Sequence, residues 1–137
     1  MKFFAAIFTF VLIHVFQTTA KAIHVGHSFT FKSIKKAVES AQPFDSLIIH
    51  SGIYREGNIT INNSIVFKGI NYPVLDGQNK YEIISIKSND VIVDGFRLQH
   101  AGRSGIEDIA GIKIYNRNNV SVINNILDDT NFGIYTQ

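Results

Sequence analysis

A short run of β-branched residues bounded by Asn and Gly recurs along the chain, and this recurrence limits the fold more than any other feature. The segment NSIVFKG at 63–69 aligns with NDVIVDG at 89–95 and again with NNVSVIN at 118–124. A second register agrees, because GIKI at 111–114 recurs as GIYT at 133–136. The spacing between repeats is in the twenties, which is typical of a solenoid in which each repeat forms one coil.

The strand-like runs are short and are separated by turn residues. Every Asn lies at or after position 58, and Asn tolerates the left-handed backbone of tight turns. Leucine-rich repeats have a similar period but need regularly spaced Leu, whereas this chain is rich in Ile. The pattern therefore predicts a parallel β-helix with strands at residues 47–49, 59–61, 65–67, 83–86, 91–93, 112–114 and 120–122.

Stacked coils place equivalent residues of successive repeats on top of one another, about 4.8 Å apart. The alignment predicts two such inward ladders, one of Ile65, Val91 and Val120 and one of Phe67, Val93 and Val122. Residues 100–108 are additional to the length of one repeat, and we expect them to form a loop that projects from one turn of the solenoid.

One amphipathic helix is predicted before the repeats, at residues 31–42. Its apolar residues fall at i, i+3, i+4 and i+7, on one face of a helix: Ile34, Ala37, Val38 and Ala41. Pro43 ends the pattern. Because the first coil of a solenoid exposes unpaired strand edges, we expect this helix to cap the N-terminal end.

The segment 1–22 has the layout of a secretory signal peptide. Lys2 is followed by a largely apolar run over residues 3–16 and by the small-x-small pattern of Ala20, Lys21 and Ala22. The apolar run is shorter than the roughly 20 residues of a membrane-spanning helix, and an uncleaved N-terminal anchor is the alternative. We expect cleavage after Ala22, which removes both excess positive charges of a chain with 13 basic and 11 acidic residues.

The absence of Cys restricts the environment and the chemistry of the chain. It excludes a disulfide framework, a thiolate zinc site and a cysteine nucleophile. An exported chain without Cys fits a bacterial periplasm better than a small disulfide-bonded secreted module. The net charge of +2 is too small to predict a nucleic-acid partner.

The repeat region carries a resemblance to a known family. Its distinguishing motifs are PVLDG at 73–77, DGF at 94–96, and GRS at 102–104 followed by AGI at 110–112. Together with the signal peptide and the helix, these motifs resemble NosD, the periplasmic accessory protein of nitrous oxide reductase maturation, over residues 24–137. The resemblance implies an all-β fold, a right-handed parallel β-helix of the pectate-lyase type with an N-terminal capping helix.

The resemblance also implies a function in denitrification. NosD-like proteins are docking platforms on the outer face of an ABC transporter, and the implied partners are its ATPase and permease subunits, a copper-delivering lipoprotein and the reductase. They assist assembly of the copper centres of the reductase and are not known as enzymes. We therefore expect a periplasmic, non-enzymatic protein without a bound cofactor of its own, in a pathway that handles copper.

The length departs from that family, whose members have several hundred residues. We expect residues 1–22 to form the signal peptide and residues 23–45 a lead-in segment with the capping helix. We expect residues 46–137 to form the β-helix coils, truncated at the C-terminal end, so that the chain is an N-terminal fragment.

The projecting loop supplies the candidate partner-docking residues, which are His100, Arg103, Glu107 and Asp108. A metal site remains unassigned. Copper(I) prefers sulfur ligands, and the mature chain has neither Cys nor Met, so any copper contact would depend on imidazole. His24 and His27 are close enough in sequence to chelate a metal together, and His50 follows a strand.

Two alternative functions remain open: a carbohydrate-active β-helix enzyme, such as a polysaccharide lyase, esterase or epimerase, and a structural or adhesive β-helix. A lyase or esterase would need a stripe of Asp, Arg or Lys across several coils, and the alignment predicts none. Asp76 and Asp94 precede Gly and indicate turns, whereas Asp128 and Asp129 could bind calcium with a neighbouring coil. No catalytic residue is therefore predicted.

Overall fold

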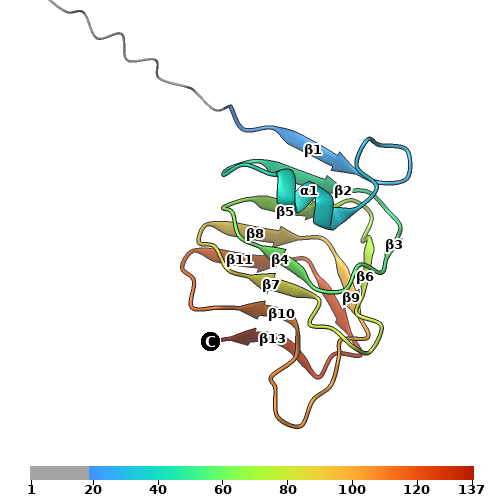
Figure 1. The fold of residues 1–137 in the computed structure, drawn as a ribbon, viewed down its shortest axis with the longest axis vertical. Helices are drawn as coiled ribbons and strands as arrows, with labels where there is room; N and C mark the ends of the chain where they lie inside the picture. The colour runs from blue at the N-terminus through green and yellow to red at the C-terminus, as the bar shows by residue number, and fades with distance from the viewer. Residues whose placement is uncertain (1–18) are drawn as a thin grey trace, which may run out of the picture.

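A computed structural model describes residues 19–137 and shows a right-handed parallel β-helix with one short helix (Figure 1). The fold prediction is confirmed. The chain passes through three sheets in turn and then starts the next coil, so each sheet grows by one parallel strand per coil. Residues 1–18 of the predicted signal peptide lie outside the described residues.

The first sheet has five strands and contains the repeat that the sequence alignment identified. Its strands, in spatial order, are β1 (Ala22–Val25), β2 (Ser46–Ile49), β5 (Val66–Gly69), β8 (Val91–Asp94) and β11 (Val120–Ile123). Val91 pairs with Val120, and Phe67 and Val122 both pair with Val93, as the alignment predicted. Phe67 and Phe96 are fully buried, and their rings stack with centroids 4.4 Å apart in the middle of the core.

The other two sheets have four strands each. One contains β3 (Ile53–Tyr54), β6 (Val74–Asp76), β9 (Arg97–Gln99) and β12 (Ile126–Asp128), and the other contains β4 (Ile59–Ile61), β7 (Ile84–Ile86), β10 (Ala110–Ile114) and β13 (Phe132–Thr136). Ile112 pairs with Ile134, which confirms the second register. The short strands β6, β9 and β12 add a third inward ladder that the alignment missed, made of Leu75, Leu98 and Leu127.

Turns between the strands use the residues expected of them. Five Asn residues have positive φ angles: Asn71, Asn79, Asn116, Asn119 and Asn124. Gly95 also has a positive φ of 81°, and a Cβ there would lie 2.8 Å from the carbonyl oxygen of Gly69 in the coil above. Only Gly fits where these two corners stack.

Helix α1 (Ile34–Ser40) covers the N-terminal end, where it packs against β1, β2 and β4 (Figure 1). It is shorter than the predicted range of 31–42, because Ser33 is an extended N-cap residue and Ala41 leaves the helical conformation. No helix among residues 19–137 combines the length and hydropathy needed to cross a membrane.

Candidate functional site

The predicted projecting loop connects β9 to β10 and extends beyond β13 at the lower end of the molecule (Figure 1). Its base is tightly packed. A Cβ on Gly102 would lie 2.7 Å from the backbone of Lys80, and one on Gly77 would lie 2.6 Å from the carbonyl oxygen of His100. The backbone N–H of Gly102 donates to Tyr81 O at 2.9 Å. The start of the loop is therefore fixed to the preceding coil.

Asp76 is a buried carboxylate that forms an ionic cluster with two more exposed side chains beneath the same loop. Its Oδ1 accepts hydrogen bonds from the Gln78 backbone at 2.9 Å and from His100 Nδ1 at 3.1 Å, and its Oδ2 lies 3.3 Å from Arg55 Nε. Burial alone would raise the pKa of Asp76, but the hydrogen bonds from Gln78 and His100 and the charge of Arg55 lower it overall. Asp76 begins a turn, as predicted, and also anchors the loop.

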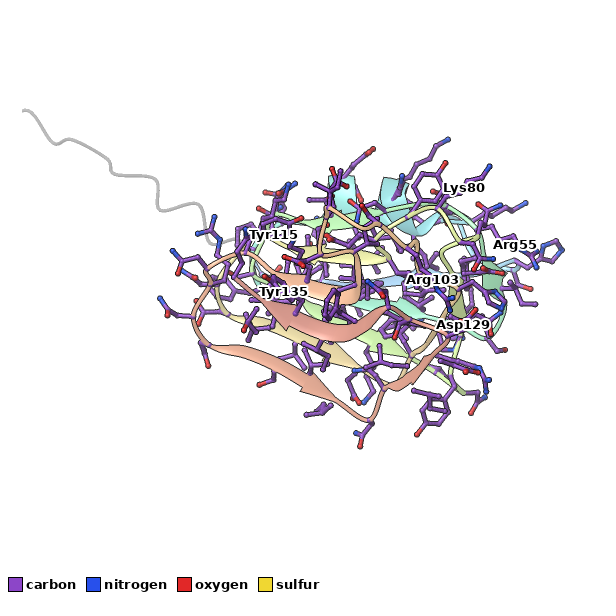
Figure 2. All side chains as sticks on the ribbon, turned by 90° about the horizontal axis from the view of Figure 1, so that it is seen from below. Arg55, Lys80, Arg103, Tyr115, Asp129 and Tyr135 are labelled. Atoms are coloured by element: carbon purple, nitrogen blue, oxygen red, sulfur yellow. The ribbon has the colours of Figure 1, made fainter. Side chains whose placement is uncertain are left out.

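The four predicted docking residues fall into two groups. His100 is held by Asp76, and Arg103 forms an ion pair with Asp129 of the next coil (Figure 2). Glu107 and Asp108 instead line a cavity between the loop and the sheet that contains β7 and β10. The first two residues therefore shape the loop, and the other two face a site that the sequence did not predict.

This cavity, which we call the lysine groove, has a volume of about 560 Å³. It lies on the outer side of the coils and is lined by charged and aromatic residues from the strands, the loop and the turn before β7. The lining residues are Asn58, Lys80, Tyr81, Glu82, Ser85, Lys87, Ile106, Glu107, Asp108, Ile109, Lys113 and Tyr115.

A hydrogen-bonded network forms the floor of the lysine groove. Asn58 Nδ2 donates to Ser85 Oγ at 2.8 Å, and Ser85 Oγ donates in turn to Glu82. The phenol of Tyr115 donates to Glu82 Oε1 at 3.1 Å. Burial and the neighbouring Glu82 carboxylate raise the pKa of Tyr115, so its hydroxyl remains protonated at neutral pH.

Two lysines and a second tyrosine complete this side of the groove. The ammonium groups of Lys87 and Lys113 lie 4.9 and 5.1 Å from the ring centroid of Tyr115, and that of Lys113 also lies 5.2 Å from the Tyr135 ring. Figure 2 shows Tyr115 and Tyr135 near each other on the outside of the coils. Interaction with the Asp108 carboxylate raises the pKa of Tyr135.

The aligned repeats contained a signal for this groove. GIKI and GIYT place Lys113 beside Tyr135 on the outward side, and the structure pairs these residues and also pairs Lys113 with Ser85. A polar row therefore crosses three coils, but its members are Ser, Lys and Tyr rather than the repeated Asp, Arg or Lys that the sequence analysis considered for a lyase or esterase.

The histidines near the N-terminus are arranged differently from the predicted chelating pair. His24 Nδ1 lies 2.9 Å from Nε2 of His50 on the next coil, and the rings of both residues pack against Phe29. His27 lines a separate hollow with Tyr54. Within residues 19–137 no three His, Cys, Asp or Glu side chains gather in a way that could hold a metal ion.

The two aspartates considered for calcium are paired with arginines. Asp128 forms an ion pair with Arg97, and Asp129 forms one with Arg103. Each carboxylate is therefore neutralised across two stacked coils, and the two pairs hold the last coil against the preceding one.

Comparison with known proteins found no relative: no family model, no curated protein and no solved structure matches this chain.

Proposed function

We propose that this protein is a periplasmic, NosD-like accessory protein that acts as a docking platform for assembly of the copper centres of nitrous oxide reductase. The observation that carries the proposal is the position of the motifs on which the resemblance depends. Three of the four motifs, at residues 73–77, 102–104 and 110–112, meet at the base and the end of the projecting loop.

The arrangement of the loop suits a docking role. Gly77 and Gly102 fit its base against the coils, and Asp76 holds His100, so the loop is presented in one orientation. At its tip, the side chain of Ile106 is 98% exposed and is flanked by Glu107 and Asp108. The proposed partners are the permease subunit of the ABC transporter with its ATPase, the copper-delivering lipoprotein and the reductase.

Copper maturation in the source organism tests this proposal. Deletion of the gene should leave the reductase without its copper centres, and expression of the wild-type protein should restore them. The variant Ile106→Asp should fail to restore the copper centres. The control variant Ile53→Asp, which changes an isoleucine that is 58% exposed on β3, should restore them. A deletion strain whose reductase keeps its full copper content would disprove the proposal.

The lysine groove favours a second candidate function, that of a carbohydrate-active enzyme. Glu82 and Tyr115 are hydrogen-bonded groups that can exchange protons, and they lie in an open cavity. Incubation with acidic polysaccharides should then produce new chain ends, and Glu82→Gln should abolish their formation. Absence of any chain cleavage or ester loss would reject this candidate.

A further inference from the structure

The lysine groove is lined by three lysines and three carboxylates, and no ion pair joins them within residues 19–137. Lys80, Lys87 and Lys113 all line it, yet none of them takes part in the ion pairs formed within residues 19–137. Lys87 and Lys113 instead lie against tyrosine rings. Because the lysines are not paired with these carboxylates, their ammonium groups remain available to anionic groups of a ligand.

The acidic residues of the groove are directed to hydroxyl groups. Glu82 accepts hydrogen bonds from Ser85 and Tyr115, and the Asp108 carboxylate interacts with the Tyr135 hydroxyl. Glu107 lines the loop side of the same cavity. The groove thus offers ammonium groups that can bind anions. Its carboxylates can accept hydrogen bonds from hydroxyl groups of a ligand, and its amide can donate or accept them.

We propose that the lysine groove binds a short stretch of an acidic polysaccharide, with uronate carboxylates on the lysines and sugar hydroxyls on the acidic side. Such a chain combines the two kinds of group that the groove recognises. An acidic peptide would satisfy the lysines but would bring no hydroxyl groups to Glu82, Glu107 and Asp108. This inference goes beyond the docking role and holds whether or not the bound sugar is cleaved.

The register of the sheet sets the direction of the bound chain. Ser85, Lys113 and Tyr135 occupy paired positions on three successive strands, about 4.8 Å apart from one strand to the next. Their outward side chains therefore form a row along the solenoid axis. The sugar chain is expected to lie along this row, with the 100–109 loop on its flank.

Calorimetric titration of the whole exported protein with a galacturonate hexamer tests the proposal. Binding should be measurable at low ionic strength and should weaken as salt is added, because the contacts are ionic. The fully methyl-esterified hexamer should bind at least about tenfold more weakly, since it lacks the charges. Lys87→Gln and Lys113→Gln should each lower the affinity about tenfold as well.

The control is Lys36→Gln, at an exposed lysine on helix α1, which should leave the affinity unchanged. Thermal unfolding of each variant separates lost binding from lost folding.

Equal binding of the charged and the esterified hexamer would overturn the proposal. Equal effects of the three lysine substitutions on the affinity would also overturn it. Tighter binding of a poly-glutamate peptide than of the uronate would also overturn it and would identify an acidic peptide as the ligand. Binding without chain cleavage would reject the enzyme candidate and leave this inference standing.

Discussion

Asp76 illustrates how a single residue links the turn chemistry of the chain to the site. Its side chain is 7% exposed. The carboxylate accepts hydrogen bonds from the Gln78 backbone and from His100 and forms an ion pair with Arg55. Asp76→Asn keeps the shape but removes the charge, and hydrogen bonds to a charged group contribute about 2 kcal/mol. We therefore expect the variant to lose about this amount of unfolding free energy at neutral pH.

The pH dependence of this loss follows from the direction of the pKa shift. The pKa of Asp76 is lower in the folded protein than its ordinary value of 3.8, so its stabilisation is present above pH 3.8 and is lost as the pH falls below it. Urea unfolding at pH 7 and pH 3 should show a large difference between wild type and Asp76→Asn at pH 7 and a small one at pH 3. The control is Asp90→Asn, at an exposed turn residue. A difference that is the same at both pH values would contradict this explanation.

The same residue shows where sequence reasoning at the residue scale ends. The Asp-Gly pair at 76–77 correctly predicted a turn, because this depends on local backbone preference. The partners of the carboxylate are 21 and 24 residues away in sequence, at Arg55 and His100. Their meeting depends on the register of three coils, which includes β6 and β9, two strands that were not predicted.

At the scale of elements, two of the three sheets were predicted from sequence and one was missed. The missed strands β3, β6, β9 and β12 have two or three residues each. The predicted strands β4 and β7 are as short, but they have Ile at both inward positions, whereas in β6, β9 and β12 a single Leu provides the inward contact. The strands of the first sheet have four residues each, which is the length at which alternation becomes visible.

The helix prediction was correct in type and face but too long, because the N-terminus of α1 is set by a distant residue. Glu56 accepts hydrogen bonds from Ser33 Oγ at 2.6 Å, from Ile34 N at 2.8 Å and from Lys35 N at 3.0 Å. It thereby satisfies N–H groups that the helix itself leaves free. A glutamate that follows β3 thus fixes the start of a helix that precedes it in sequence.

We predict that Glu56→Ala lowers the unfolding free energy by about 1–2 kcal/mol, the usual effect of losing a helix cap. Glu39→Ala, on the exposed side of α1, should change it by less than about 0.5 kcal/mol. Chemical unfolding followed by circular dichroism measures both. If Glu56→Ala were as stable as the wild-type protein, the helix would not depend on this contact.

At the scale of the whole molecule, the candidate site could not be predicted because it exists only between elements. The lysine groove combines Asn58 before β4, Glu82 before β7, Lys113 on β10 and the loop that ends at residue 109. Of these positions, the repeat alignment identified only that of Lys113, and the loop residues Glu107 and Asp108 were predicted for docking rather than for a groove. Their chemistry becomes apparent only when the coils are stacked, since stacking turns one outward residue in each repeat into a continuous row.

The two ends of the solenoid differ, and this difference predicts how the chain associates. The outermost strands at both ends, β1, β3 and β4 at one and β11, β12 and β13 at the other, have a neighbouring strand on one side only, but helix α1 packs against β1 and β4 at the N-terminal end. The inward residues of the last coil are also less covered than their ladder partners. Val93 and Ile112 are fully buried, but Val122 is only half-buried and Ile134 is 46% exposed. Unpaired strand edges beside exposed apolar side chains favour association.

We therefore expect the purified 23–137 chain to self-associate through its last coil, with an apparent mass that rises with concentration in sedimentation velocity. The capped N-terminal end makes two last coils the contacting surfaces, so association should stop at a dimer rather than continue as a filament. Ile134→Lys places a charge at this end and should shift the chain to monomer, because inward charges block edge pairing. Ile106→Lys, on the projecting loop, should leave the association unchanged. Equal self-association of the two variants, or growth into long filaments, would show that the open coil is not the contact.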